Sequence, residues 1–399
     1  MYREMLEAMK EGSAARLREK RNAQATWFNE WADLFLKAYQ PGQKVVSTSI
    51  YAFPMELLAA FDVVPFDFEI AASMVCATEM GVPAMCEAEG RGYALDVCSF
   101  HRAGLGGFYR DYFPKPELFL TTSYFCDGKV KTNEILSRLH SKECLLLYVP
   151  AEINRDSLRY VEKQLRHIAS KIGEVAGQRL DEDRLKEAVR SSNRARRSHL
   201  ALLEVQKHRP APLSPRLIIS FSINGLLFSG RETKERLNQE LLAEARGRIE
   251  SGALRPERHR FYWFAWMPVY QSGLFDFLKE KQIGVPLCET FRVHWDEIDE
   301  NRPFEGLALK CLNNPFVGPV GRRTEGLEKI VEEYAIDGAV KFVTPACRHS
   351  NNGAGLLKNS LQRLGIPLLQ VEMDIGDPRG YSPGQTRTRL ESFVEVLSQ

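Results

Sequence analysis

The segment Ala94–Lys131, ALDVCSFHRAGLGGFYRDYFPKPELFLTTSYFCDGKVK, carries two cysteines in settings that indicate both a fold and a site. Cys98 precedes a glycine-rich helix, and Cys126 follows the apolar run Leu118–Thr122, which is typical of a buried strand. A thiol at the carboxyl end of a parallel strand lies where an open α/β sheet binds its ligands, and the start of the next helix favours a thiolate. Cys347 has the same setting in GAVKFVTPACRHSNNGAGLLKN. We therefore predict that the three cysteines meet at one metal site.

Strand patterns alternate with helical patterns on both sides of a helical middle region, which is typical of parallel sheets. Four strands are predicted in the first part of the chain, at KVVSTS, VVPFDF, ELFLTT and ECLLLYVP, and four in the last part, at FYWFAWMP, GVPLCET, GAVKFVTP and PLLQVEM. The predicted fold class is α/β, with two Rossmann-like parallel-sheet domains, a helical N-terminus and a helical middle region. The predicted domains are residues 1–155 for the N-terminal helices and the first sheet, 156–255 for the helical region and 256–399 for the second sheet.

Charge and hydropathy argue against two classes of partner. The chain has 54 basic and 52 acidic side chains, so charge alone implies no nucleic-acid partner. No apolar run approaches the roughly 20 residues that a membrane-spanning helix needs. The first residues, MYREMLEAMKEGSAARLREK, are charged and lack the apolar region of a signal peptide. We expect a cytoplasmic protein that binds neither nucleic acid nor membrane.

The eight cysteines of a cytoplasmic chain are metal ligands, catalytic groups or packed thiols more often than disulfides. No CxxC pair is present, so spacing alone identifies no zinc ribbon or ferredoxin site. Cys144, inside an apolar strand, and Cys76 are interpreted as packed thiols. Ligation and packing are both open for the three cysteines in intermediate settings, which are Cys86, Cys288 and Cys311.

Several side chains other than cysteine are candidates for the chemistry. His101 and Arg102 follow Cys98 closely enough to act on a metal-bound ligand as an acid or an anion clamp, although an exposed loop pair would look the same. His349 is placed to hydrogen-bond sulfur or substrate, and Glu56 is either a buried general acid or a charge at a helix start. The aromatic run between Tyr262 and Tyr270 is interpreted as a buried strand rather than a stacking surface.

Five segments together resemble the family of 2-hydroxyacyl-CoA dehydratase D-components and benzoyl-CoA reductase cluster subunits. They are FPMELLAAFDVVPF, DVCSFHRAGLG, the strand before Cys126-Asp127, the strand before Cys347 and the tail GIPLLQVEMDIGDPRGYSPGQTRTRLESFVEVL. The resemblance implies two Rossmann-like domains with a helical region. It also implies an iron-sulfur cubane held by three cysteines, which match Cys98, Cys126 and Cys347.

The additional cysteines suggest the branch of double-cubane cluster proteins. The resemblance then implies a homodimer in which two linked 4Fe-4S cubanes use six cysteines, with Cys86, Cys288 and Cys311 as the second set; Cys76 is an alternative to Cys86. It also implies an anaerobic oxidoreductase that reduces a small-molecule substrate. Its electrons would come from a separate ATP-hydrolysing iron-sulfur activator. The chain has no Walker motif, since Gly225–Gly230 is followed by arginine and glutamate, which agrees with ATP hydrolysis on another protein.

Three alternatives stay open. The first is a subunit of a 2-hydroxyacyl-CoA dehydratase with a single 4Fe-4S cluster and ketyl-radical chemistry. The second is a non-enzymatic electron or metal carrier with the same fold. The third is an α/β protein stabilised by zinc, for which cysteine thiolates are equally suitable ligands.

Overall fold

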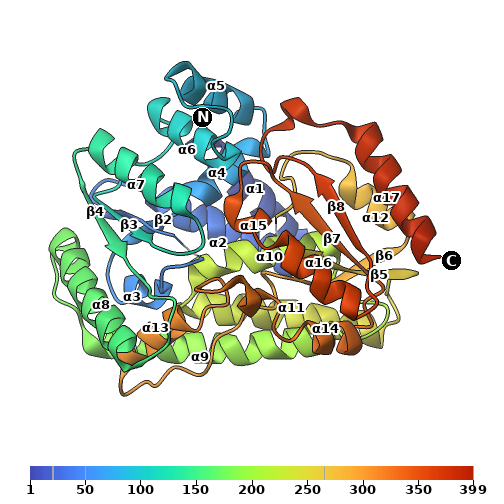
Figure 1. Cartoon of the computed structure of the whole chain (residues 1–399). Helices are drawn as coiled ribbons and strands as arrows, with labels where there is room; N and C mark the ends of the chain where they lie inside the picture. Colours follow the sequence, from blue (N-terminus) through green and yellow to red (C-terminus); the bar gives the residue numbers. More distant parts are fainter. Residues whose placement is uncertain (20–21, 50, 265, 399) are drawn as a thin grey trace.

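The computed structural model describes residues 1–19, 22–49, 51–264 and 266–398, and within them it contains two four-stranded parallel sheets. Figure 1 shows the strands of the first sheet on the left and those of the second on the right, with the long helices α8 (Arg155–Ala176) and α9 (Glu182–Val205) along the lower side. The predicted α/β fold, with two Rossmann-like sheets, a helical N-terminus and a helical middle region, is confirmed.

The first sheet has the strand order β2-β1-β3-β4. Every residue of β3 is buried, because helices cover both faces of the inner strands of a parallel sheet. In the register, Val46 of β1 pairs with Pro65 of β2 and with Leu118 of β3. The elements of this part are α1 (Tyr2–Glu19), α2 (Ala23–Lys37), β1 (Val45–Ser47), α3 (Met55–Ala59), β2 (Val64–Phe66), α4 (Phe68–Cys76), α5 (Gly81–Gly90), α6 (Ser99–Tyr109), β3 (Leu118–Thr122), α7 (Asp127–Leu139) and β4 (Glu143–Leu147).

The second sheet has the order β6-β5-β7-β8, and every residue of β5 is buried. Its edge strand β8 is only partly buried, as β4 is in the first sheet. The elements of this part are β5 (His259–Phe264), α12 (Leu274–Glu280), β6 (Ile283–Cys288), α13 (Pro303–Leu312), η2 (Val320–Arg323), α14 (Leu327–Glu333), β7 (Gly338–Val343), α15 (Arg348–Asn351), α16 (Ala354–Arg363), β8 (Leu368–Glu372), η3 (Pro378–Gly380) and α17 (Pro383–Leu397).

Both sheets therefore have the same topology. The first strand of each sheet, β1 or β5, lies between the second and third strands. The chain moves to one side of the first strand and returns on the other, so the crevice between the first and third strands is a topological switch point, where open α/β sheets bind ligands. Cys126 follows β3 and Cys347 follows β7, which brings one thiol to the switch point of each sheet.

The two helices between β2 and α6 were not predicted from the sequence. Helix α4 begins at an N-cap, Asp67, whose side chain accepts hydrogen bonds from the backbone N–H groups of Glu69 and Ile70 at 2.8 and 3.2 Å. Helix α5 packs closely on α6: a Cβ atom added at Gly106 of α6 would lie 1.7 Å from the carbonyl oxygen of Ala84. The contact with α5 fixes the position of α6, the helix that begins directly after Cys98.

A helical region lies between the two sheets, as predicted. It contains the long helices α8, α9 and α11, with the shorter segments α10 and η1 before α11. The side chain of Asn154 caps α8 and that of Asp181 caps α9, and Gly177 ends α8 with a φ of 68°. The remaining bounds are α10 (Pro215–Asn224), η1 (Gly225–Phe228) and α11 (Glu232–Glu250). The division into three domains stays a prediction. Within the described ranges, no helix combines the length and the apolar character that crossing a membrane requires.

Candidate metal centre

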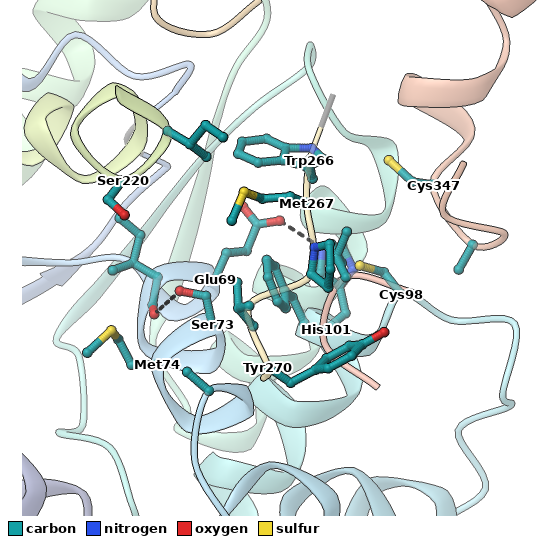
Figure 2. A pocket seen from close by; sticks show the side chains of 18 of the residues that line it. Glu69, Ser73, Met74, Cys98, His101, Ser220, Trp266, Met267, Tyr270 and Cys347 are labelled. Carbon is teal, nitrogen blue, oxygen red and sulfur yellow. Dashed lines mark hydrogen bonds and ion pairs between the residues drawn. The ribbon is translucent and has the colours of Figure 1, made fainter. Parts of the chain in front are cut away.

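Cys98, Cys126 and Cys347, called here the three-thiol set, line one cavity of about 880 Å³. Each is the N-cap residue of a helix, α6, α7 and α15 respectively, although α15 has only four residues. Figure 2 shows Cys98 and Cys347 on one side of the cavity and Ser220 on the opposite side of the view. The three-thiol set thus combines two residues from the first sheet unit with one from the second.

The electrostatics of the three-thiol set are those of a site that needs a cation. Burial raises the pKa of Cys98, and the neighbouring Cys347 and Cys126 raise it further. Burial likewise raises the pKa of Cys347 to about 11, with Cys126 contributing in the same direction and a backbone hydrogen bond at Ser350 opposing it. Each ionised thiol raises the pKa of its neighbours in the set, so the fully ionised set is stable only with a bound positive charge. The set fits an iron-sulfur cluster, whose several irons bind thiolates that are further apart than the ligands of a single ion.

Glu69 on α4 connects the two helices that carry Cys98 and Cys126. Its Oε1 lies 3.0 Å from Nε2 of His101 on α6, and its Oε2 forms an ion pair with Nζ of Lys129 on α7. Burial alone would raise the pKa of Glu69, but the charge of Lys129 and the hydrogen bond with His101 lower it to about 2. Sequence reasoning missed Glu69, because its only local signal is an acidic residue in the first turn of a capped helix.

His101 lies beside Cys126, with 3.9 Å between Nε2 and the thiol sulfur. The same Nε2 atom contacts both Cys126 and Glu69, so this group differs from a thiol-imidazole-carboxylate relay, which uses both ring nitrogens. A Cβ atom added at Gly128 would lie 3.0 and 3.1 Å from Cε1 and Nδ1 of the imidazole. The missing side chain at Gly128 therefore lets the ring approach Cys126.

Arg102 lies outside the cavity lining. Its buried guanidinium forms an ion pair with Glu89, donates to Oδ2 of Asp377 at 3.1 Å and donates to the carbonyl of Val97 at 3.0 Å. Arg379 contacts the same two carboxylates, Glu89 and Asp377. This four-charge group joins α5 and α6 to the segment after β8, so the contacts of Arg102 are structural ones between the two sheet units.

We predict that Asp377→Asn weakens this junction in a pH-dependent way. Burial alone would raise the pKa of Asp377, but hydrogen bonds from Arg379 and the charge of Arg102 lower it to about 2. A carboxylate with a lowered pKa stabilises the fold above its unfolded pKa and loses this contribution as the pH falls through its folded pKa. The variant should be less stable by about 1–2 kcal/mol at neutral pH.

Denaturant unfolding at a series of pH values measures this effect. The difference between the wild type and Asp377→Asn should shrink as the pH falls from about 4 towards about 2. Asp62→Asn is the matched control, because the ion pair of Asp62 with Arg184 is exposed and should contribute much less. A constant difference at all pH values would contradict the assigned role of Asp377.

Glu56 and His349 have different positions relative to the cavity. Glu56 is fully buried away from its lining, where it accepts a hydrogen bond from Ser192 at 2.5 Å and pairs with Lys310 at 2.5 Å. His349 lines the cavity and stacks on Phe125 with 4.8 Å between ring centroids. Burial lowers the pKa of His349 to about 4, and the charge of Arg323 adds to this effect.

The remaining candidate cysteines lie outside the lining of this cavity. Cys86 is exposed on α5, with its sulfur 3.6 Å from Nη1 of Arg379. Cys288 is buried at the end of β6, 3.5 Å from the hydroxyl of Thr290, and Cys311 is buried on α13. Whether these three thiols bind metal stays a prediction.

The rest of the cavity wall is largely aromatic and apolar. Strand β5 ends at Phe264, and Trp266, Met267 and Tyr270 line the cavity, so the prediction that the whole aromatic run is a buried strand was wrong for its second half. The reason is that Pro268 cannot continue a central strand, and the carboxyl end of β5 lies at the switch point. The main apolar lining residues are Tyr51, Phe100, Phe125, Trp266, Met267 and Tyr270.

The fold and the site together place the chain in a class of α/β proteins in which two parallel-sheet units line one cavity that contains thiols. The sequence model of the family described as 2-hydroxyglutaryl-CoA dehydratase, D-component, matches residues 50–397, so the chain belongs to this family. One of the subunits of benzoyl-CoA reductase from Thauera aromatica is 26% identical over 394 residues, covering 90% of each chain. The (R)-phenyllactyl-CoA dehydratase alpha subunit of Clostridium sporogenes is 23% identical, covering 91% of each chain.

A third relative is the alpha subunit of (R)-2-hydroxyglutaryl-CoA dehydratase from Acidaminococcus fermentans, which is 21% identical over 71% of this chain and 61% of its own length. These relatives are subunits of reductases and dehydratases. The predicted family resemblance is thus confirmed, and the chain is an enzyme of this family.

Proposed function

We propose that this chain is the cluster-binding subunit of an oxygen-sensitive reductase or dehydratase, with one 4Fe-4S cluster held by Cys98, Cys126 and Cys347. The observation that supports this most directly is that these three thiols, from two sheet units, line one cavity. A cubane held by three protein thiolates leaves one iron with an open position, and it would supply single electrons and a Lewis acid.

The protein contributes position, charge and exclusion of water. Glu69 keeps α6 and α7, and hence Cys98 and Cys126, at a set separation through its contacts with His101 and Lys129. The aromatic wall limits the contact of solvent with the thiols, which are partly buried, and this suits chemistry at low potential. The lining contains three cations, Lys131, Arg216 and Arg348, beside the carboxylates of Glu69, Asp96, Asp127 and Asp276, so an anionic substrate would be bound by these individual cations rather than by the net charge of the wall.

The names of the relatives suggest an acyl-CoA thioester as the substrate class. We propose that the apolar wall contacts the acyl group and that the cations face the phosphates. We also propose that electrons come from a separate ATP-hydrolysing activator, in agreement with the absence of a Walker motif from the sequence. The cytoplasmic location, the homodimer and the small-molecule substrate of a double-cubane reductase stay predictions.

The single cluster is favoured over the double cubane by the positions of the other cysteines. A double cubane needs three further thiolates near the first set, whereas Cys86, Cys288 and Cys311 lie outside the cavity lining. Cys288 and Cys311 are both 2% exposed; Cys288 contacts Thr290, and Cys311 contacts Tyr124.

Anaerobic reconstitution followed by iron and sulfide analysis tests the proposal. We expect about four irons per chain, since one cubane contains this number. About eight irons per chain, with reductase activity in the absence of an acyl-CoA, would instead support the double-cubane prediction. A metal-free chain that takes up neither iron nor sulfide during this reconstitution would contradict both forms of the iron-sulfur proposal, whether or not it binds zinc afterwards.

A further inference from the structure

A second donor set lies within the cavity wall and overlaps the three-thiol set at only one residue. One ligand atom each of Glu69, His101 and Cys126 lies within 4.8 Å of the other two. Nε2 of His101 is 3.0 Å from Oε1 of Glu69 and 3.9 Å from Sγ of Cys126. Donor atoms of a tetrahedral zinc site lie roughly 3.3–3.8 Å apart, given Zn–N and Zn–O bonds near 2.1 Å and Zn–S bonds near 2.3 Å. One ion therefore fits between these atoms after shifts of under about 1 Å.

We propose that the chain without a cluster binds one divalent transition-metal ion of the Zn²⁺ type through Glu69, His101 and Cys126. Carboxylate, imidazole and thiolate together are a donor set suited to zinc, and three protein ligands leave a fourth position open. All three residues line the cavity, so the fourth position faces the space that would hold a substrate.

The neighbours of this Glu-His-Cys site support it as a built site. Lys129 holds Oε2 of Glu69 and thereby orients Oε1 towards His101, which is the role of an outer-sphere partner in metal sites. Gly128 leaves room for the imidazole on its Nδ1 side, so that Nε2 points to the other two donors. A divalent ion would be neutralised by one thiolate and one carboxylate. The nearby Lys129 then leaves one positive charge in excess, so we expect the fourth ligand to be water or an anion.

The Glu-His-Cys site and the three-thiol set share Cys126, so the two kinds of occupancy exclude each other. The zinc site does not rest on the proposed function, because two of its three ligands, Glu69 and His101, lie outside the three-thiol set. Its consequence rests on that function: a chain that has lost its cluster would bind zinc at a defined position.

The test is a titration of the full-length chain, stripped of metal by chelation, with Zn²⁺ followed by calorimetry and metal analysis. We expect one zinc per chain. Glu69→Gln and His101→Phe should each weaken binding at least about tenfold, since changes to outer-sphere partners alone already lower metal affinity about 10–100-fold. Cys347→Ser is the matched control, since it removes a thiol of the cluster set but no zinc ligand, and its zinc affinity should stay within about twofold of the wild type.

Two results would overturn the inference. One is a folded wild-type chain that binds no zinc. The other is a Cys347→Ser variant that loses zinc as strongly as His101→Phe does, which would assign the ion to the three-thiol set. Cobalt(II) added to the wild type gives a readout that needs no variant. Its charge-transfer absorption should have the intensity of one thiolate ligand, and the intensity of three would contradict the Glu-His-Cys site.

Discussion

Cys98→Ser, Cys126→Ser and Cys347→Ser are each expected to lower the iron content of the anaerobically reconstituted chain more than about tenfold. Each residue supplies the only thiolate that its helix start contributes to the cavity, and a serine hydroxyl is a poor ligand for a cluster that prefers soft donors. Cys347→Ser is the most direct test of a site shared by the two sheet units, because Cys347 is the only member of the three-thiol set from the second sheet unit. Iron and sulfide per chain, together with the visible absorption of the cluster, measure the effect.

Cys144→Ser is the control for this series. Cys144 is half-buried on the edge strand β4 and lies outside the cavity lining, so its removal should leave the iron content unchanged. Cys288→Ser and Cys311→Ser carry the test of the double cubane, and we expect full iron in both. Loss of about half of the iron in either variant would restore the double-cubane prediction. Full iron in Cys347→Ser would refute the three-thiol set itself.

Gly106→Ala is expected to cause the largest loss of stability among single substitutions near the site. The added methyl group would lie 1.7 Å from the carbonyl oxygen of Ala84, which belongs to the backbone of α5 and cannot move without shifting that helix. Overpacking alone costs about 1–3 kcal/mol, and a backbone collision should exceed this, so we expect a loss of at least about 3 kcal/mol. The site should be disturbed as well, because α6 begins directly after Cys98.

Thermal and denaturant unfolding of the purified variant measure this loss. Gly247→Ala on α11 is the matched control, because it is also a helical glycine but a Cβ atom there meets nothing within 4 Å. That variant should be more stable than the wild type by about 0.5–1 kcal/mol, since alanine has the better helix propensity. Wild-type stability of Gly106→Ala would show that α5 and α6 can separate without cost.

Local pattern was sufficient to predict both sheets and the positions of the three thiols along the chain. All eight predicted strands are present, because apolar runs bounded by turn residues are a local signal. The settings of Cys98, Cys126 and Cys347 at helix starts were equally readable, since a strand followed by a cysteine and a helix is contiguous in sequence. Parallel topology then requires that such positions gather at one edge of each sheet.

Only the tertiary structure decided which side chains meet when they are far apart in the sequence. Arg102 meets Asp377 across 275 positions, and Glu56 meets Lys310 across 254, so neither pairing has a local signal. The same is true of Glu69, which joins His101 and Lys129 from two later helices. Periodicity reports which face of an element is buried, whereas the partner of a buried charge depends on how complete elements pack against each other. The sequence by itself therefore determined the strands and the helix starts that follow Cys98, Cys126 and Cys347, and packing decided which charged side chains hold these elements together.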